Sequence, residues 1–299
     1  MNNKCSGVLL AGILLLFASC EKEIQLDVEP HQAQLVINST TITGEPLEVF
    51  VSKSVGMQEY NRNKNLNVPN ATVIAKSGSG LTEQLMYNPA TGSYTSTNNT
   101  NPGTQYTLTV SAQGLGTATA STHATSSVAI AQISRLRNVR LSAEGYAQDE
   151  LKVVFDDPAG AGDYYIVGLH RVDSIPDTVM YAQCVNSVDP DIETISSEEM
   201  DNTTCLQPDA IFLRDQLFNG KRKELRLFVD SRYFSTAAPG TVFVHLSHVS
   251  EDFFRYYKSY LYATENTGNP FAEPINIYNN ITNGRGVFSI MNTDIRVVE

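Results

Sequence analysis

A stretch of 51 residues without a single Asp, Glu, Lys or Arg runs from Gln84 to Ser134. Within residues 91–110, twelve of twenty are Ser, Thr or Asn. Thr is β-branched and favours strands, whereas Ser and Asn favour turns, so this composition opposes long helices. The stretch predicts short strands joined by tight turns, and it points to an all-β fold for this part of the chain.

Alternation of apolar and polar residues identifies individual strands in and near this stretch. Two sets share one strand face each: Leu47, Val49 and Val51, and further along Tyr106, Leu108 and Val110. Turn-forming sequences occur at residues 88–92 (Asn-Pro-Ala-Thr-Gly) and 101–103 (Asn-Pro-Gly). We therefore expect residues 31–125 to form an antiparallel β-sandwich, broadly immunoglobulin-like or transthyretin-like.

Charged and aromatic residues return after a segment at residues 122–131 that resembles a linker or a crossing strand. Strand-like runs follow at residues 151–155, 164–169, 225–229 and 242–246. Residues 186–215 have few apolar runs, and we expect them to cross the surface. The pattern predicts a second β-rich domain over residues 126–299, so the whole chain is expected to be mainly β.

One helix is expected within this second domain, at about residues 250–265. Ser250 is a suitable N-cap, and Glu251 and Asp252 lie in the first turn. Helical spacing places five apolar residues on one face: Phe253, Tyr256, Tyr257, Tyr260 and Leu261. This aromatic face belongs either to the core or to a ligand-binding surface, and the opposite face carries Phe254 and Lys258.

The first twenty residues are typical of an exported lipoprotein. An apolar run of ten residues at 8–17 is too short to span a membrane and has the length of a signal-peptide core. Ala18 and Ser19 are small residues directly before Cys20. We expect cleavage of residues 1–19 and lipidation of Cys20; the alternative is an ordinary signal peptide with an incidental cysteine. Residues 20–30 then form a polar tether, followed by the sandwich.

Two further cysteines remain in the exported chain, Cys184 and Cys205. In an oxidising compartment they are candidates for a disulfide that closes a loop of about 20 residues, worth roughly 3 kcal/mol in the chain-entropy model. The alternative is two free, buried thiols. Zinc is not expected here, because neither cysteine has a second cysteine or a histidine at ligand spacing.

Residues with recognisable catalytic spacing are missing from the sequence. His245 and His248 are three apart, so on a strand their side chains point to opposite faces and do not chelate one ion together. Asp156 and Asp157 precede a proline and are more typical of a turn than of a catalytic pair. We therefore expect no enzyme activity, no cofactor and no metal site.

A cluster of carboxylates between the two cysteines is the best candidate for ion binding: Asp189, Asp191, Glu193, Glu198, Glu199 and Asp201. Weak calcium binding is one interpretation, although the spacing is not that of an EF-hand loop. A solvated acidic loop is the other. A basic cluster at residues 221–226 is either a solvated strand edge or a partner for this acidic segment.

Several segments resemble a family of Bacteroidota lipoproteins, the family of domain of unknown function 4249. They are CEKEIQLDV at the start of the mature chain, LVINSTTITGE, DPAGAGDYYIV, LFNGKRKELRLFVD, SEDFFRYYKSY and GNPFAEPINIYNNITNGRGVF. The resemblance implies an outer-membrane lipoprotein that works beside a TonB-dependent receptor, and it implies no catalytic residues. Acidic residues after Cys20 also resemble the surface-export signal of such lipoproteins.

Net charge limits the partners. The chain has 299 residues, a net charge of −11 and a pI near 4.9, which argues against nucleic acid as a partner. We expect a non-catalytic accessory to a TonB-dependent receptor, held to the outer membrane by its lipid, facing the cell exterior and capturing a small ligand of unknown identity. The alternative is a stand-alone structural or adhesive surface lipoprotein, and a surface hydrolase is a distant third.

Overall fold

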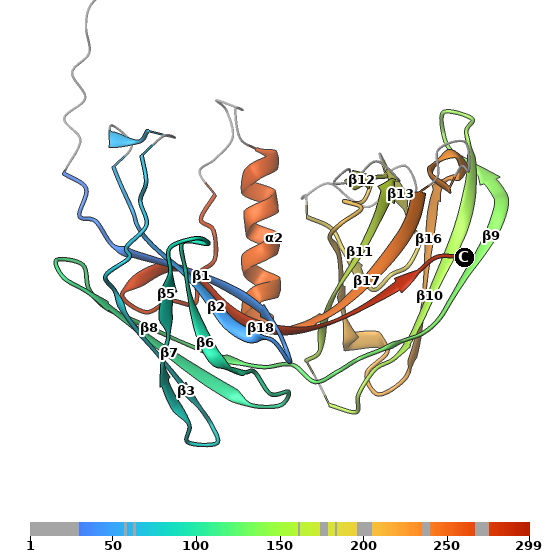
Figure 1. The fold of residues 1–299 in the computed structure, drawn as a ribbon. Coiled ribbons are helices and arrows are strands. Elements are labelled where there is room, and N and C mark those ends of the chain that lie inside the picture. The colour runs from blue at the N-terminus through green and yellow to red at the C-terminus, as the bar shows by residue number, and fades with distance from the viewer. Residues whose placement is uncertain are drawn as a thin grey trace, which may run out of the picture. The chain divides into compact units, whose positions relative to one another are not determined.

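The computed structural model describes residues 30–56, 59–61, 64–160, 162–173, 179–182, 184–195, 205–234, 240–266 and 275–299. The chain divides after Gln32, and every element below lies in the unit Ala33–Glu299. This unit is mainly β, as predicted, and its described residues contain one α-helix (Figure 1). No helix among the described residues is both long enough and apolar enough to cross a membrane.

Two sheets form the N-terminal part of this unit. Its strands are β1 (Leu35–Ile42), β2 (Pro46–Lys53), β3 (Thr72–Ser77), β4 (Thr82–Gln84), β5 (Met86–Asn88), β6 (Ser93–Asn99), β7 (Gln105–Ala112) and β8 (Gly116–His123). One sheet contains the order β1-β2-β6-β5 and the other β4-β3-β7-β8. The alternating residues predicted on β2 and β7 are buried in the shared core: Leu47, Val49, Val51, Tyr106, Leu108 and Val110.

A second core lies between the sheets of the following part. Its elements are β9 (Ile130–Leu141), β10 (Ala147–Asp156), β11 (Tyr164–Asp173), β12 (Val179–Tyr181), β13 (Val185–Asn186), β14 (Ile192–Glu193), β15 (Ile211–Arg214), the 3-10 helix η2 (Asp215–Leu217), β16 (Arg222–Asp230), the 3-10 helix η3 (Ser231–Phe234) and β17 (Gly240–Val249). One sheet has the order β13-β16-β10-β9, and another contains β14-β15-β11-β17. Buried side chains from β10, β11, β16 and β17 fill the space between them.

The C-terminal strand β18 (Gly284–Val297) joins the two parts into one continuous sheet (Figure 1). Residues 284–291 pair in parallel with the whole of β1, and residues 292–297 pair antiparallel with β17. The predicted division after residue 125 therefore needs correction, because half of β18 belongs to the N-terminal sandwich. Phe288 and Ile290 are buried in that sandwich's core. Pairing between the two ends of a chain leaves no local pattern in the sequence.

The predicted helix is α2 (Glu251–Glu265), and its N-cap is Ser250, whose hydroxyl accepts a hydrogen bond from the Phe253 amide at 3.3 Å. Phe254, predicted on the outer face, is instead fully buried. Its ring lies 5.0 Å from that of Phe212 and 5.1 Å from that of Tyr164. The buried surface of the helix therefore includes Phe254, which lies outside the predicted apolar face. Tyr260, which belongs to the predicted face, is 43% exposed.

Candidate functional site

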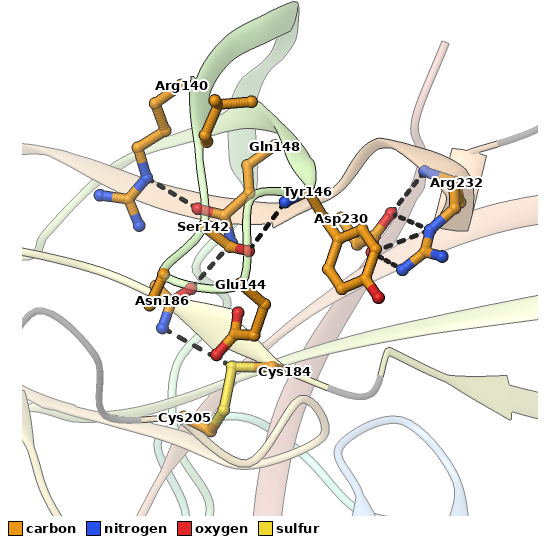
Figure 2. A pocket seen from close by; sticks show the side chains of 12 residues that line it. Arg140, Ser142, Glu144, Tyr146, Gln148, Cys184, Asn186, Cys205, Asp230 and Arg232 are labelled. Carbon is orange, nitrogen blue, oxygen red and sulfur yellow. Dashed lines mark hydrogen bonds and ion pairs between the residues drawn. A yellow bond between two sulfur atoms is a disulfide. The ribbon is translucent and has the colours of Figure 1, made fainter.

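A pocket of about 460 Å³ lies beside the turn between β9 and β10 (Figure 2). The disulfide between Cys184 and Cys205 forms part of its wall. These are the two cysteines that the sequence singled out as a candidate pair, and their Cα atoms are 5.0 Å apart. The polar residues that line the rest of the pocket are Arg140, Ser142, Glu144, Tyr146, Gln148, Asn186, Asp230 and Arg232.

A chain of hydrogen bonds crosses the pocket wall from β9 to the disulfide (Figure 2). Arg140 Nε donates to the Gln148 side-chain oxygen at 2.8 Å, and Gln148 Nε2 donates to Asn186 Oδ1 at 2.8 Å. Asn186 Nδ2 lies 3.6 Å from the sulfur of Cys184. The Arg140 guanidinium also stacks on the Phe228 ring at 3.7 Å, and burial lowers the pKa of Arg140. No carboxylate among the described residues is paired with Arg140.

The opposite side of the pocket carries an ion pair between Arg232 and Asp230. Arg232 Nε donates to both carboxylate oxygens of Asp230, at 3.0 and 3.1 Å, and this hydrogen bonding lowers the pKa of Asp230. The Arg232 guanidinium lies 4.2 Å from the centre of the Tyr146 ring. Tyr146 is 50% exposed, so part of its ring remains accessible beside Arg232. The pocket therefore offers hydrogen-bond donors, acceptors and an aromatic face, which is typical of a binding site for a small polar molecule.

The three described carboxylates of the acidic segment proposed for calcium each pair with a basic side chain. Lys223 is buried and donates to Asp189 at 2.6 Å and to Asp191. Lys258 pairs with Glu193 at 2.8 Å. These three carboxylates are paired with basic side chains, and the basic cluster supplies one of the partners, Lys223. Glu198, Glu199 and Asp201 lie outside the described residues.

Asp156 and Asp157 behave differently from each other. Asp156 is exposed and pairs with Arg222 at 2.8 Å, whereas Asp157 is buried and accepts hydrogen bonds from the Tyr165 hydroxyl and the Gly220 amide. Burial raises the pKa of Asp157. Carboxylate oxygens of Asp157, Asp163 and Asp215 lie within 4.8 Å of one another.

Hydrogen bonds already engage this carboxylate cluster. His248 Nε2 lies 2.8 Å from Asp163 Oδ1, and the Gly162 amide donates to Asp215 Oδ2 at 3.1 Å. We therefore assign no metal to the cluster. Sequence reasoning missed it because Asp215 comes from a distant segment that only the fold brings to the connection between β10 and β11, where Asp157 and Asp163 lie.

The prediction that His245 and His248 face opposite sides of their strand is confirmed. His248 contacts Asp163 and stacks on Tyr165, whereas His245 contacts His170 on β11. The sequence analysis missed this pair of histidines, since they are 75 positions apart. The register of β11 with β17, in which Gly168 lies opposite His245, brings the two histidines together. This register is not visible in the sequence.

The predicted signal peptide, Cys20 and nearly all of the tether lie outside the described residues. The compact unit begins at Ala33, two residues before β1. From Cys20 to Leu35 the chain is long enough to reach some 45 Å if fully extended, at about 3.3 Å per residue.

Comparisons with known proteins identify a family but no activity. No curated protein matches the chain. A solved structure of trypsin-activated alpha-2-macroglobulin from Escherichia coli matches 76% of this chain at 10% identity, with a TM-score of 0.24. This chain spans only 15% of that structure. A family model described as "Domain of unknown function (DUF4249)" matches residues 21–296, and the chain belongs to this family.

Proposed function

We propose that the chain is a lipid-anchored protein of the outer membrane, facing the cell exterior, which assists a TonB-dependent receptor in capturing a nutrient. The observation that carries this proposal is the segment around Cys20. There, an apolar run and two small residues precede a cysteine that Glu21 and Glu23 closely follow. A lipid on Cys20 holds the protein at a membrane without any spanning segment.

The pocket beside the disulfide supports a role in binding. Its volume of about 460 Å³ suits a small molecule, and Arg140 supplies a guanidinium that no described carboxylate neutralises. An anionic or strongly polar ligand would gain charge-assisted hydrogen bonds from Arg140 and stacking from Tyr146. These groups bind and orient a molecule, and we propose no catalytic step for them.

One observation favours the second candidate, a stand-alone structural or adhesive lipoprotein. Strands β7 and β8 present cross-strand pairs of exposed hydroxyl groups, Thr107 with Ser121 at 3.1 Å and Ser111 with Thr117 at 2.9 Å. A hydroxyl-rich sheet face of this kind suits contact with polar surfaces.

Affinity purification of the full-length, C-terminally tagged protein from gently solubilised outer membranes separates the two candidates. Recovery of a TonB-dependent receptor at near-equal stoichiometry supports the accessory role. The matched control is Cys20→Ala, which removes the lipidation site and is expected to lose both membrane association and the receptor. Recovery of the wild-type protein alone, with crosslinking still capturing no receptor, overturns the accessory role in favour of the stand-alone one.

A further inference from the structure

Two histidines lie side by side on the sheet face that carries α2. His170 on β11 and His245 on β17 occupy diagonal positions of an antiparallel pair, because His170 lies opposite Phe243 and His245 lies opposite Gly168. Diagonal neighbours on one face are within reach of long or aromatic side chains. His245 Nε2 contacts His170 Nδ1, and the ring centres are 4.3 Å apart.

An aromatic side chain packs against one of the two rings. Phe243 stacks on His170 with ring centres 5.2 Å apart. Gly168 lies opposite His245, and a Cβ there would stand 3.0 Å from the backbone oxygen of Asp209. The glycine therefore lets the Asp209 backbone lie close to β11.

The pair of histidines opens into a pocket of about 390 Å³. Asp209, Met291 and Tyr257 also line this pocket. Neither lysine nor arginine is among the described residues that line it. The described lining therefore presents the two imidazoles without a fixed positive charge that would repel a cation.

A neutral imidazole has one nitrogen that carries a proton and one nitrogen whose lone pair can bind a metal ion. No described residue hydrogen-bonds to the outer nitrogens, His170 Nε2 and His245 Nδ1.

We propose that His170 and His245 together bind a divalent transition-metal ion, such as Zn²⁺, in the pocket between β11, β17 and α2. Imidazole nitrogen is a preferred ligand of Zn²⁺, Ni²⁺ and Cu²⁺. The site is independent of the proposed receptor partner and of the pocket beside the disulfide.

Binding needs only a small movement of the rings. Each zinc–nitrogen bond is about 2.0–2.1 Å long, so a tetrahedral angle places the two nitrogens about 3.3 Å apart. Rotation of the His245 side chain opens the present contact to that separation. When both rings are neutral, the proton between His245 Nε2 and His170 Nδ1 moves to an outer nitrogen on binding, and no proton is released.

Calorimetric titration of Zn²⁺ into the untagged, chelator-treated mature chain tests the proposal. We expect one ion per chain in the wild type. In His170→Ala and in His245→Ala we expect the dissociation constant to be at least tenfold larger. His245→Gln keeps a polar side chain of similar length and is expected to lose binding equally, with an unfolding midpoint close to that of the wild type.

Two control variants exclude other sites. His123→Ala removes an exposed histidine at the end of β8, and Asp215→Asn alters the carboxylate cluster; both are expected to bind Zn²⁺ as the wild type does. No binding by the wild type, unchanged affinity in both histidine variants, or loss of binding in Asp215→Asn alone would overturn the metal site. Receptor capture from membranes is measured separately, so failure of either proposal leaves the other distinguishable.

Discussion

Gly286 lies directly against the carbonyl oxygen of Ile37: a Cβ on Gly286 would stand 2.0 Å from that oxygen. Gly286 also has a φ of +111°, a conformation that side chains rarely adopt. The two residues are partners in the parallel pairing of β1 with β18. This contact explains why a glycine is needed in the middle of the junction between the first and last strands.

Replacement of this glycine is expected to destabilise the whole unit. Gly286→Ala should lower the free energy of unfolding by at least about 2 kcal/mol, because the new Cβ meets backbone that moves only with the strand. Urea unfolding followed by circular dichroism measures the loss. Gly103→Ala is the matched control: its φ is +66° with nothing within 4 Å of the new Cβ, so only about 1 kcal/mol is expected. Equal losses in the two variants would contradict the steric explanation.

The buried ammonium of Lys223 is expected to be essential for the acidic segment that it contacts. Lys223→Met keeps the side-chain length but leaves Asp189 and Asp191 as uncompensated buried carboxylates, which typically costs about 3–5 kcal/mol. Arg222→Ala breaks the exposed pair with Asp156, and solvent screening of this pair makes the expected loss much smaller. Chemical denaturation compares the two, and a loss in Lys223→Met as small as that in Arg222→Ala would show that the buried pairing contributes little.

The disulfide should contribute to the stability of the pocket-bearing region. Cys184→Ser combined with Cys205→Ser is expected to lower the free energy of unfolding by about 3 kcal/mol, since the bond closes a loop with a sequence separation of 21. The same loss is expected when the wild type unfolds under reducing conditions. If reduction leaves the unfolding midpoint unchanged, the covalent bond does not stabilise this region.

Adjacent aspartates are expected to give opposite dependences of stability on pH. Burial raises the pKa of Asp157 in the folded state, so its contribution is present below the ordinary value of 3.8 and is lost as the pH rises through the higher folded pKa. The variant Asp157→Asn has no ionisable group here and does not lose stability in this way. The stability of the variant relative to the wild type should therefore increase as the pH rises above 4.

The control for this dependence is Asp156→Asn. Hydrogen bonding from Arg222 lowers the pKa of Asp156, so the wild type gains stability as the pH rises through the range below 3.8 and the variant does not. Thermal unfolding at several pH values between 3 and 8 measures both differences. Slopes of the same sign for the two variants would refute the assignment of Asp157 as the residue with the raised pKa.

Local patterns in the sequence predicted the elements better than their assembly. The alternation of Leu47, Val49 and Val51 gave the buried face of β2, and the N-cap and spacing after Ser250 gave α2 nearly to the residue. Such patterns reflect interactions within a few positions of each residue. They failed for Phe254, because two strands, β11 and β15, supply aromatic partners on a side that helical periodicity assigns to solvent.

Contacts between distant segments had no signal of this kind. The proximity of His170 to His245, and of Asp157 to Asp215, follows from strand register and from the path of β11 between two neighbours. The division of the chain at residue 125 failed for the same reason, since β1 and β18 lie at opposite ends of the sequence. Composition and motif spacing identify the residue types present but not which of them meet.

The pairing of β1 with β18 also determines when the protein can finish folding. The first strand to be synthesised obtains its parallel neighbour only after residues 284–291 have been made, some 250 positions later. Until then one edge of β1 has no neighbour and the sandwich core lacks Phe288 and Ile290, so completion of this sheet waits for the end of synthesis. A chain that stops before β18 would lack these two core side chains and would leave β17 without one of its two neighbours, and we expect it to be incompletely folded.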